Sequence, residues 1–190
     1  MILGLTGKKG SGKSTVATLL NKHYRYEVMG FGDPIKKMLA AMGVPTQYLF
    51  DPSKKEEVVP GLGKSARFMM QTLGSAWARD IINEDVWVKS MDQRLGLLQI
   101  EQEVDEPDCV IDDVRFQNEA DYIHSVGGKI ILVARPLDPP ADDHESEKGL
   151  DPGNIDATIN NISCYTTDLM ESLKQYMEAS DNGSVHLTQP

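Results

Sequence analysis

The chain has 190 residues, of which 40% are hydrophobic and 25% charged, and its net charge is −10. This ordinary composition excludes disordered, collagen-like and disulfide-scaffold proteins, and the length suits one compact α/β domain. The negative charge argues against a nucleic-acid partner, because phosphate backbones need dense Lys and Arg coverage. Positive charge is nevertheless concentrated early: residues 1–64 hold ten Lys and Arg against five Asp and Glu.

Nothing in the sequence predicts a membrane segment or an export signal. No apolar run approaches the ~20 residues that a membrane-spanning helix needs. The first residues, MILGLT, lack the basic flank and cleavage site of a signal peptide. Cys109 and Cys164 are expected to be buried free thiols in a reducing compartment. We therefore expect a cytoplasmic protein with no membrane partner.

In chain order, the first half predicts a strand over 2–6, a helix over 14–24, a strand over 26–31 and a helix over 33–42. Asp33 is the expected N-cap of that last helix, with Pro34 as its first helical residue. Residues 45–64 are rich in Pro, Gly and Lys and predict a long excursion of the chain. Helices are expected over 65–82 and 84–98, and Trp77 and Trp87 are expected in the core.

The second half predicts a strand over 109–112, a helix over 117–126, strands over 129–134 and 157–160, and a helix over 167–178. A polar loop is expected over 135–156 and a flexible tail over 180–190. Strands that alternate with helices predict a three-layer α/β/α fold around a central, mainly parallel five-stranded sheet. In such folds the ligand binds at the carboxyl ends of the strands.

Residues 7–14, GKKGSGKS, match the phosphate-binding pattern G-x-x-x-x-G-K-[ST] at every fixed position. Glycines let backbone N–H groups turn inward around a polyphosphate, and the N-terminus of the following helix adds positive potential. Lys13 is expected to reach the β- and γ-phosphates of ATP, and the Ser14 hydroxyl to join a Mg²⁺ shell. The residues expected to contact ATP phosphates are Gly7, Lys9, Gly10, Ser11, Gly12, Lys13, Ser14 and Thr15. A GTPase is disfavoured because the chain lacks an N-K-x-D motif.

A second group of polar residues follows the predicted strand at 109–112. Asp112 and Asp113 end a buried run, and one carboxylate there typically holds Mg²⁺ through water. The two would face opposite sides if the strand continued through them, so one is expected to act. Arg115 suits bidentate binding of a phosphate.

Three side chains of the predicted 65–82 helix are candidates for a second substrate. Arg67 and Arg79 are twelve residues apart, so at 100° per residue they need not share a face. Gln71 lies one turn beyond Arg67, where it could read a base edge. Each has the alternative of being an ordinary surface side chain.

The order and spacing of these motifs resemble the deoxynucleoside monophosphate kinases of tailed bacteriophages, a branch of the P-loop nucleotide kinases. The matching stretches are the phosphate loop, FGDPIK at 31–36, RFMMQTLG at 67–74, WV at 87–88, DVRFQNE at 113–119, RP at 135–136, HESE at 144–147, Asp156 and IN at 159–160. The resemblance implies a single kinase domain over 1–179, an acceptor-binding helical region at about 45–98 and a short lid at about 135–150. The resemblance also favours Asp113 over Asp112 as the functional carboxylate.

The implied reaction transfers the γ-phosphoryl group of ATP to a deoxynucleoside monophosphate, with Mg²⁺ as the cofactor, and supplies nucleotides for DNA replication in the host cytoplasm. The implied catalytic group is Lys13, Asp113, Arg115 and Arg135. The implied acceptor-binding group is Asp33, Arg67, Gln71, Arg79 and Arg115, and the implied metal ligands are Ser14 and Asp113.

The predicted lid departs from the family pattern, because it holds only Arg135 and Lys148 against a larger number of acidic residues. Positive charge for the transferred group would then come from Lys13, Arg115, Arg135 and Lys8 or Lys9. His144 is expected to be an exposed loop residue rather than a metal ligand. The alternatives are a small P-loop kinase for dephospho-coenzyme A or a sugar acid, and an ATP-binding module without transferase activity. A homodimer, the accepted bases and the sugar preference are left open.

Overall fold

The computed structural model describes residues 1–135, 149–161 and 166–181. The chain divides into two compact units. The first comprises Met1–Met29 and Leu97–Pro190, and the second comprises Gly30–Gly96. The boundary falls within helix α5 (Val86–Gln102). The predicted lid, including His144 and Lys148, lies almost wholly outside the described residues, as does Cys164.

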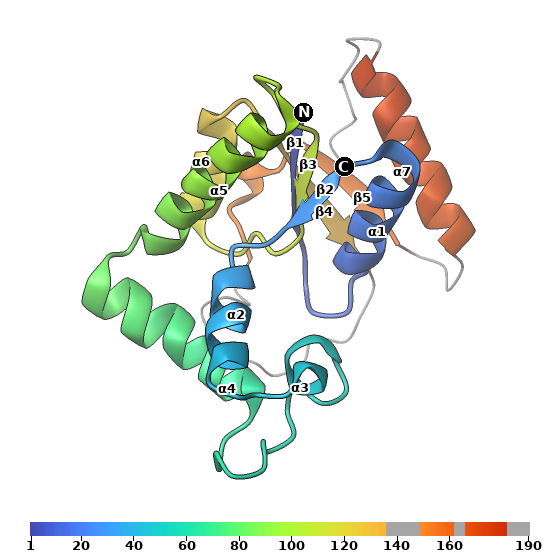
Figure 1. The fold of residues 1–190 in the computed structure, drawn as a ribbon. Coiled ribbons are helices and arrows are strands. Elements are labelled where there is room, and N and C mark those ends of the chain that lie inside the picture. Colours follow the sequence, from blue (N-terminus) through green and yellow to red (C-terminus); the bar gives the residue numbers. More distant parts are fainter. Residues whose placement is uncertain (136–148, 162–165, 182–190) are drawn as a thin grey trace. The chain divides into compact units, whose positions relative to one another are not determined.

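The first unit is built on a five-stranded sheet in the order β2-β3-β1-β4-β5 (Figure 1). Its strands are β1 (Ile2–Thr6), β2 (Glu27–Met29), β3 (Cys109–Ile111), β4 (Lys129–Ala134) and β5 (Ala157–Asn160). All four pairings are parallel. β1 is central, with Leu3 opposite both Val110 and Lys129. The sheet confirms the predicted α/β class and places the ends of β1, β3, β4 and β5 along one edge.

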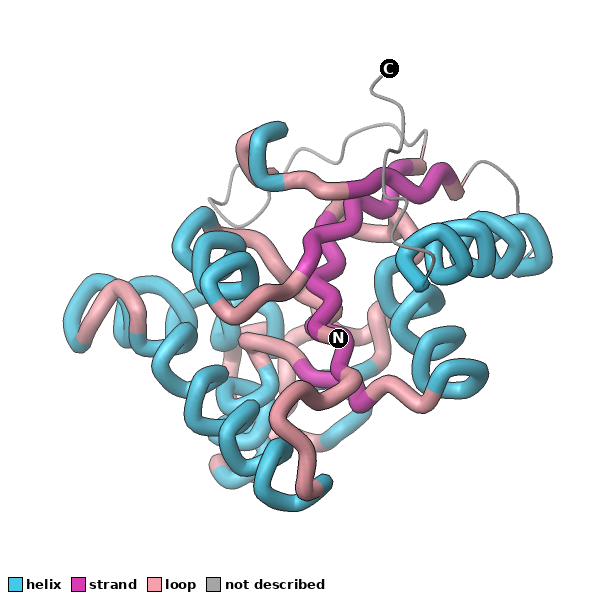
Figure 2. Tube along the Cα trace, turned by 90° about the horizontal axis from the view of Figure 1, so that it is seen from above, coloured by secondary structure: helices cyan, strands magenta, loops and turns pink. Residues whose placement is uncertain are grey.

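Helices cover both faces of this sheet. α1 (Lys13–Tyr24) and α7 (Thr166–Asp181) lie side by side on one face, seen clearly in Figure 2. α6 (Gln117–Ser125) packs on the other face against β1 and β4. A short 3₁₀ turn, η3 (Pro152–Asn154), precedes β5. The predicted three layers are therefore present within the first unit.

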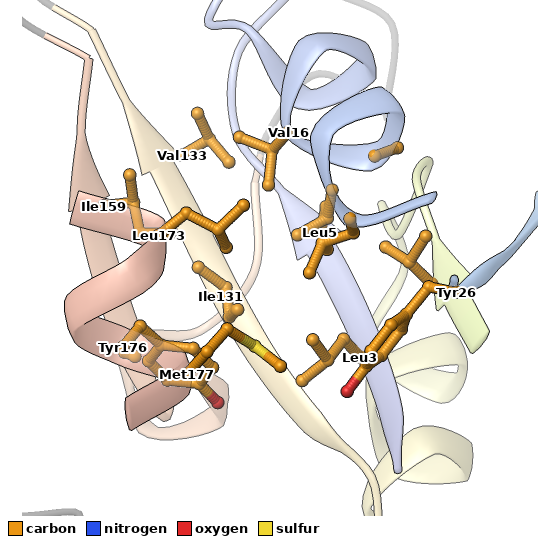
Figure 3. Packing of buried hydrophobic residues seen from close by; sticks show 14 of the residues in the cluster. Leu3, Leu5, Val16, Tyr26, Ile131, Val133, Ile159, Leu173, Tyr176 and Met177 are labelled. Atoms are coloured by element: carbon orange, nitrogen blue, oxygen red, sulfur yellow. The ribbon is translucent and has the colours of Figure 1, made fainter. Parts of the chain in front are cut away.

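The core of the first unit follows from strand alternation. Leu3 and Leu5 of β1 point to the face covered by α1 and α7, where they meet Val16 and Leu173 (Figure 3). Each fully buried Leu contributes about 1.5–3 kcal/mol relative to exposure. Gly4 faces the opposite side, where an added Cβ would come within 2.7 Å of Ile123 Cδ1 on α6. The glycine therefore lets α6 approach the central strand.

The second unit is helical. It holds α2 (Asp33–Ala41), α3 (Thr46–Phe50), α4 (Ala66–Gln71), the π-helical segment η1 (Thr72–Ile82) and the first part of α5. The long excursion expected over 45–64 contains one short helix, α3, in which Tyr48 and Leu49 are buried. The predicted 65–82 helix is confirmed as helical, with Ser65 as its cap, but it changes from α to π hydrogen bonding at Thr72.

Asp33 is not the N-cap of α2, contrary to the sequence prediction. Gly32 occupies that position and Asp33 is the first helical residue. The carboxylate of Asp33 instead accepts hydrogen bonds from the Gly30 N–H at 2.7 Å and from Arg94 Nη2 at 3.1 Å. These partners hold its side chain away from the N–H groups that a capping residue would bind.

Other boundaries differ by a few residues. β3 ends at Ile111, so Asp112 and Asp113 lie in a turn rather than on a strand. α5 begins at Val86 rather than residue 84, and α7 extends to Asp181, into the expected tail. Trp87 is buried as expected, whereas Trp77 is 40% exposed. Within the ranges that the structure covers, no helix combines the length and apolarity needed to cross a membrane.

Asp156 ties β4 to β5 at the amino-terminal end of β4. Its carboxylate accepts the Ile130 N–H at 2.8 Å and contacts His124 Nε2 at 2.9 Å and Lys129 Nζ at 3.0 Å. Burial alone would raise the pKa of Asp156, but the hydrogen bonds from Ile130, His124 and Lys129 outweigh it and lower the pKa. The ionised form is therefore the one that the folded state favours.

We expect the Asp156→Asn variant to lose about 1–3 kcal/mol of unfolding free energy at pH 7, because a charge-assisted network is broken. A carboxyl whose pKa is lowered on folding stabilises the protein above its unfolded pKa of about 4, and this contribution disappears as the pH falls through the folded value. Urea unfolding from pH 7 to pH 3 should therefore show a deficit that shrinks with acid. A constant deficit across this range would contradict the assignment.

Candidate functional site

The loop between β1 and α1 has the backbone that a phosphate-binding loop requires. Gly7, Gly10 and Gly12 have φ angles of +138°, +80° and +108°, which other residues rarely adopt. Gly12 is the N-cap of α1 and has no side chain to cap the helix. The start of α1 therefore has no side-chain cap, and the positive potential of the helix N-terminus there suits an anionic ligand.

The loop packs against the end of β4 without room for side chains. A Cβ at Gly7 would collide with the Val133 carbonyl oxygen and would lie 2.9 Å from Ser11 Oγ. Ser11 as a whole is 1% exposed, and its hydroxyl has no hydrogen-bond partner in the described part of the chain. The loop thus lies at the carboxyl edge of the sheet, where the sequence analysis predicts the ligand site.

Lys13 lies buried along the loop. Its ammonium donates to the carbonyls of Gly7 at 2.5 Å and Lys8 at 3.0 Å. The positive charge is therefore held over the inside of the loop. Lys8, Lys9 and Gly10 are exposed at its tip.

The oxygens of Ser14 and Asp113 are the expected metal ligands. Ser14 is exposed in the first turn of α1, and Asp113 is half-buried in the turn after β3. Hydroxyl and carboxylate oxygens suit Mg²⁺, which keeps several waters and takes few protein ligands beside a nucleotide. No group of three or more His, Cys, Asp or Glu that could hold a metal exists among the residues covered by the structure. The donor chemistry of Ser14 and Asp113 therefore fits a nucleotide-bound Mg²⁺.

The segment after β3 prolongs the sheet beyond the regular strands. The Asp112 N–H donates to the Met29 carbonyl at 3.0 Å, and the Val114 N–H donates to the Leu5 carbonyl at 3.1 Å. Asp113 and Arg115 flank Val114, so the main chain presents both at the carboxyl edge that carries the phosphate loop. Both side chains are half-buried.

Glu119 was not singled out from the sequence, yet it fixes the segment that bears Arg115. Its side chain is 2% exposed, and Oε2 accepts the N–H groups of Arg115 at 2.9 Å and Phe116 at 3.1 Å. A Glu three residues after the residue that precedes a helix is a recognised capping signal, which could have revealed it. Glu119 thus holds the backbone of a candidate phosphate-binding arginine.

Two side chains that follow neighbouring strands reach the phosphate loop. Arg135 comes directly after β4, and its Nη1 lies 3.4 Å from the Gly10 carbonyl. Asn161 comes directly after β5, and its Nδ2 donates to the Ser11 carbonyl at 2.8 Å. Arg135 was predicted for this site, whereas Asn161 was not. No local motif marks Asn161, because the contact joins residues 150 positions apart.

In the second unit, Arg67 is held by its neighbours on both the main chain and the side chain. Its N–H donates to the Lys55 carbonyl, and its Nε lies 3.3 Å from Glu56 Oε1. The Arg67 side chain is only 17% exposed. Gln71 is half-buried one α-helical turn further along α4, so the predicted shared face of Arg67 and Gln71 is confirmed.

Arg79 lies in the π-helical segment, where a spacing of 100° per residue does not apply. Its Nη1 donates to the Gly74 carbonyl at 2.7 Å, and Trp87 Nε1 donates to the same oxygen at 2.8 Å. Gly74 is buried, and an added Cβ would lie 3.1 Å from Ile35 Cδ1. Arg79 thus secures the fold of its own segment in addition to any role toward a ligand.

Asp33 belongs to a charged cluster that the sequence did not reveal. Lys36 Nζ lies 2.9 Å from Asp33 Oδ1, and Arg94 donates to Asp33 Oδ2 and, at 2.7 Å, to the Gly30 carbonyl. Two cations therefore share the Asp33 carboxylate. Arg94 is 61 positions from Asp33, beyond the reach of any local pattern.

The family model for deoxynucleotide monophosphate kinases matches residues 54–174, most of the chain. The chain belongs to this family. A protein of Acanthamoeba polyphaga mimivirus, whose assigned activity of deoxynucleotide monophosphate kinase is provisional, is 30% identical over 157 residues. That alignment covers 77% of this chain and 80% of the viral protein.

Solved structures show the same fold at low sequence identity. The dephospho-CoA kinase of Campylobacter jejuni gives a TM-score of 0.52 at 16% identity, covering 96% of this chain and 98% of its own. The shikimate kinase of Aquifex aeolicus gives 0.51 at 14% identity, covering 98% and 100%. The family member described here therefore has the fold of small P-loop kinases, as the sequence predicted.

We expect Glu119→Gln to lower the free energy of unfolding by about 1–3 kcal/mol, because a buried amide accepts less strongly than a carboxylate and brings an NH₂ that needs a partner. Glu171→Gln, the same change at an exposed position of α7 in the same unit, is the matched control and should stay within about 0.5 kcal/mol. Urea denaturation of both variants measures the difference. Equal stabilities would show that Glu119 does not hold the start of α6.

Proposed function

We propose that this protein is a nucleotide kinase that transfers the γ-phosphoryl group of ATP to the 5′-phosphate of a deoxynucleoside monophosphate. The observation that carries the proposal is the phosphate loop with Lys13 held over it, at the same sheet edge as Asp113, Arg115 and Arg135. Membership of the deoxynucleotide monophosphate kinase family supports the choice of acceptor.

In the proposed reaction, a phosphate oxygen of the acceptor attacks the γ-phosphorus of ATP. The bond between the γ-phosphorus and the bridging oxygen breaks, and ADP leaves with the electron pair. The attacking phosphate is already anionic near neutral pH, so no strong general base is required. Catalysis then rests on alignment and on neutralising the charge of the transferred group.

The first unit supplies the groups proposed to act on ATP. Backbone N–H groups of the loop bind the phosphates, and Lys13 neutralises charge on the β- and γ-phosphoryl oxygens. Arg115 and Arg135 are proposed to stabilise the transferred group. Ser14 and Asp113 would hold Mg²⁺, which supplies charge neutralisation on the phosphate oxygens when bound.

Four residues of the second unit, Asp33, Arg67, Gln71 and Arg79, are proposed to bind the acceptor. Arg67 has a planar guanidinium that suits bidentate phosphate binding, and Gln71 shares its face, where a base edge could be read. Arg67 already pairs with Glu56. An acceptor phosphate would therefore compete with a carboxylate for the same guanidinium.

The product class, a deoxynucleoside diphosphate, is consumed in making precursors for DNA synthesis. We therefore propose a role in deoxynucleotide supply for DNA replication, in the cytoplasm of a host cell. The mimivirus relative supports a viral source, and the phage origin expected from the sequence is part of this proposal.

A coupled ADP-release assay with ATP and Mg²⁺ tests the proposal against a panel of deoxynucleoside and ribonucleoside monophosphates, dephospho-coenzyme A and shikimate. ADP release that depends on particular deoxynucleotides is the expected result. ADP release that depends on dephospho-coenzyme A or shikimate would show that the protein is a kinase for a different acceptor. Release that is independent of every acceptor, or no release, would point to an ATPase or an ATP-binding module.

Lys13→Ala should reduce kcat/KM by roughly a hundred- to a thousandfold, because a charge aimed at the transferred phosphoryl group is removed. Lys22→Ala removes an exposed lysine from the same helix α1 and serves as the control, with activity near that of the unmodified protein. Steady-state kinetics on both variants provide the comparison. Near-normal transfer by Lys13→Ala would show that the loop takes no part in phosphoryl transfer.

Arg67→Ala should raise the KM for the acceptor by about 10- to 100-fold, the cost of losing a charged hydrogen-bond donor, while the KM for ATP changes little. Lys37→Ala, an exposed cation of α2, is the control for a general change in charge. The two KM values measured separately give the answer. An unchanged acceptor KM in Arg67→Ala would exclude Arg67 from the acceptor site.

A further inference from the structure

Asn161 is held rigidly at the carboxyl edge of the sheet. Its N–H donates to the Ala134 carbonyl at 2.7 Å, which continues the β4–β5 ladder one residue beyond β5. The position of its side chain is therefore set by the sheet rather than by a loop. From there its carboxamide reaches the phosphate loop and donates to the Ser11 carbonyl at 2.8 Å.

This hydrogen bond determines which way one peptide group of the loop faces. A trans peptide is planar, so its C=O and N–H point in opposite directions. The Ser11 carbonyl points to Asn161, and the N–H of the same peptide, which belongs to Gly12, therefore points away from Asn161. If the Ser11–Gly12 peptide were rotated, its carbonyl oxygen would take the direction in which an anion needs an N–H donor.

Asn161 also lies against the α-carbon of Gly12. A Cβ built on Gly12 would come within 2.5 Å of Asn161 Nδ2. The φ angle of +108° at Gly12 already favours glycine, and the contact adds a second reason for it. The carboxamide and the loop therefore fit together through both a hydrogen bond and close packing.

We propose that Asn161 is a positioning residue for ATP, which orients the Ser11–Gly12 peptide so that the Gly12 N–H faces the polyphosphate. The inference rests on the proposed use of this loop for ATP. Asparagine suits the role because it donates a hydrogen bond without adding charge beside the phosphates. Asn161 contacts the loop only through Ser11 and Gly12 in the contacts described above, so its effect should fall on ATP and not on the acceptor.

The test compares Asn161→Asp with Asn160→Asp. Both substitutions replace the NH₂ donor by a charged oxygen, and they lie at consecutive positions. Asn160 is exposed as the last residue of β5, so Asn160→Asp controls for added negative charge. Asn161→Ala removes the donor without adding charge. The measurements are the Kd for ATP by isothermal titration calorimetry, the KM for the acceptor, and the melting temperature without ligand.

We expect Asn161→Ala to raise the Kd for ATP by roughly three- to tenfold, the range of one net hydrogen bond, and Asn161→Asp to raise it further. Asn160→Asp should change it less than about twofold, and the acceptor KM should stay constant in all three variants. The melting temperature shows whether each variant is folded. If Asn161→Asp is not folded, the inference is tested with Asn161→Ala.

An ATP Kd in Asn161→Ala that matches the unmodified protein would overturn the inference. So would equal losses in ATP Kd and acceptor KM, since a general disturbance of the fold would cause both. The proposed function fails differently. An unmodified protein that binds ATP but phosphorylates no acceptor refutes the kinase proposal and leaves the Asn161 measurement valid, whereas one that binds no ATP overturns both.

Discussion

The seating of the loop after β1 against the end of β4 is the constraint on which the first unit depends. No side chain fits at Gly7, where a Cβ would meet the Val133 carbonyl, or at Gly12, where it would meet Asn161. Because the loop lies so close to the sheet, α1 begins directly at its carboxyl edge. Lys13 is consequently buried beside the loop carbonyls. The parallel order of the strands brings Arg115, Arg135 and Asn161 to that edge.

The sequence predicted this unit well because its signals are local. β1, β4 and β5 agree with the predicted ranges to the residue. β1 and β4 are mainly apolar runs, and β5 alternates buried Ala157 and Ile159 with exposed polar residues. The second unit was harder. α3 is short and is stabilised by tertiary burial of Leu49, and the change to π hydrogen bonding at Thr72 has no compositional signature. The roles of Arg94 and Asn161 arise from contacts between distant positions, which no motif encodes.

Each unit holds its side-chain cations in two ways. Lys13 and Arg135 of the first unit, and Arg79 of the second, donate to backbone carbonyls. Lys129 of the first unit, and Arg67 and Arg94 of the second, face carboxylates. At an ion pair an incoming anion must compete with a like charge. The affinity of Arg67 for an anion therefore includes the cost of displacing Glu56.

The reactivity of the Cys109 thiol depends on whether the sheet is folded. Cys109 begins β3, beside the central strand, and burial raises its pKa to about 12. Because the thiolate is the reactive form, oxidants and alkylating reagents meet an inert sulfur as long as the sheet is intact. An unfolded chain would expose a thiol with a pKa of about 8.5. The rate at which this sulfur is modified therefore reports how often the sheet opens, and a ligand that binds only the folded state should slow the modification.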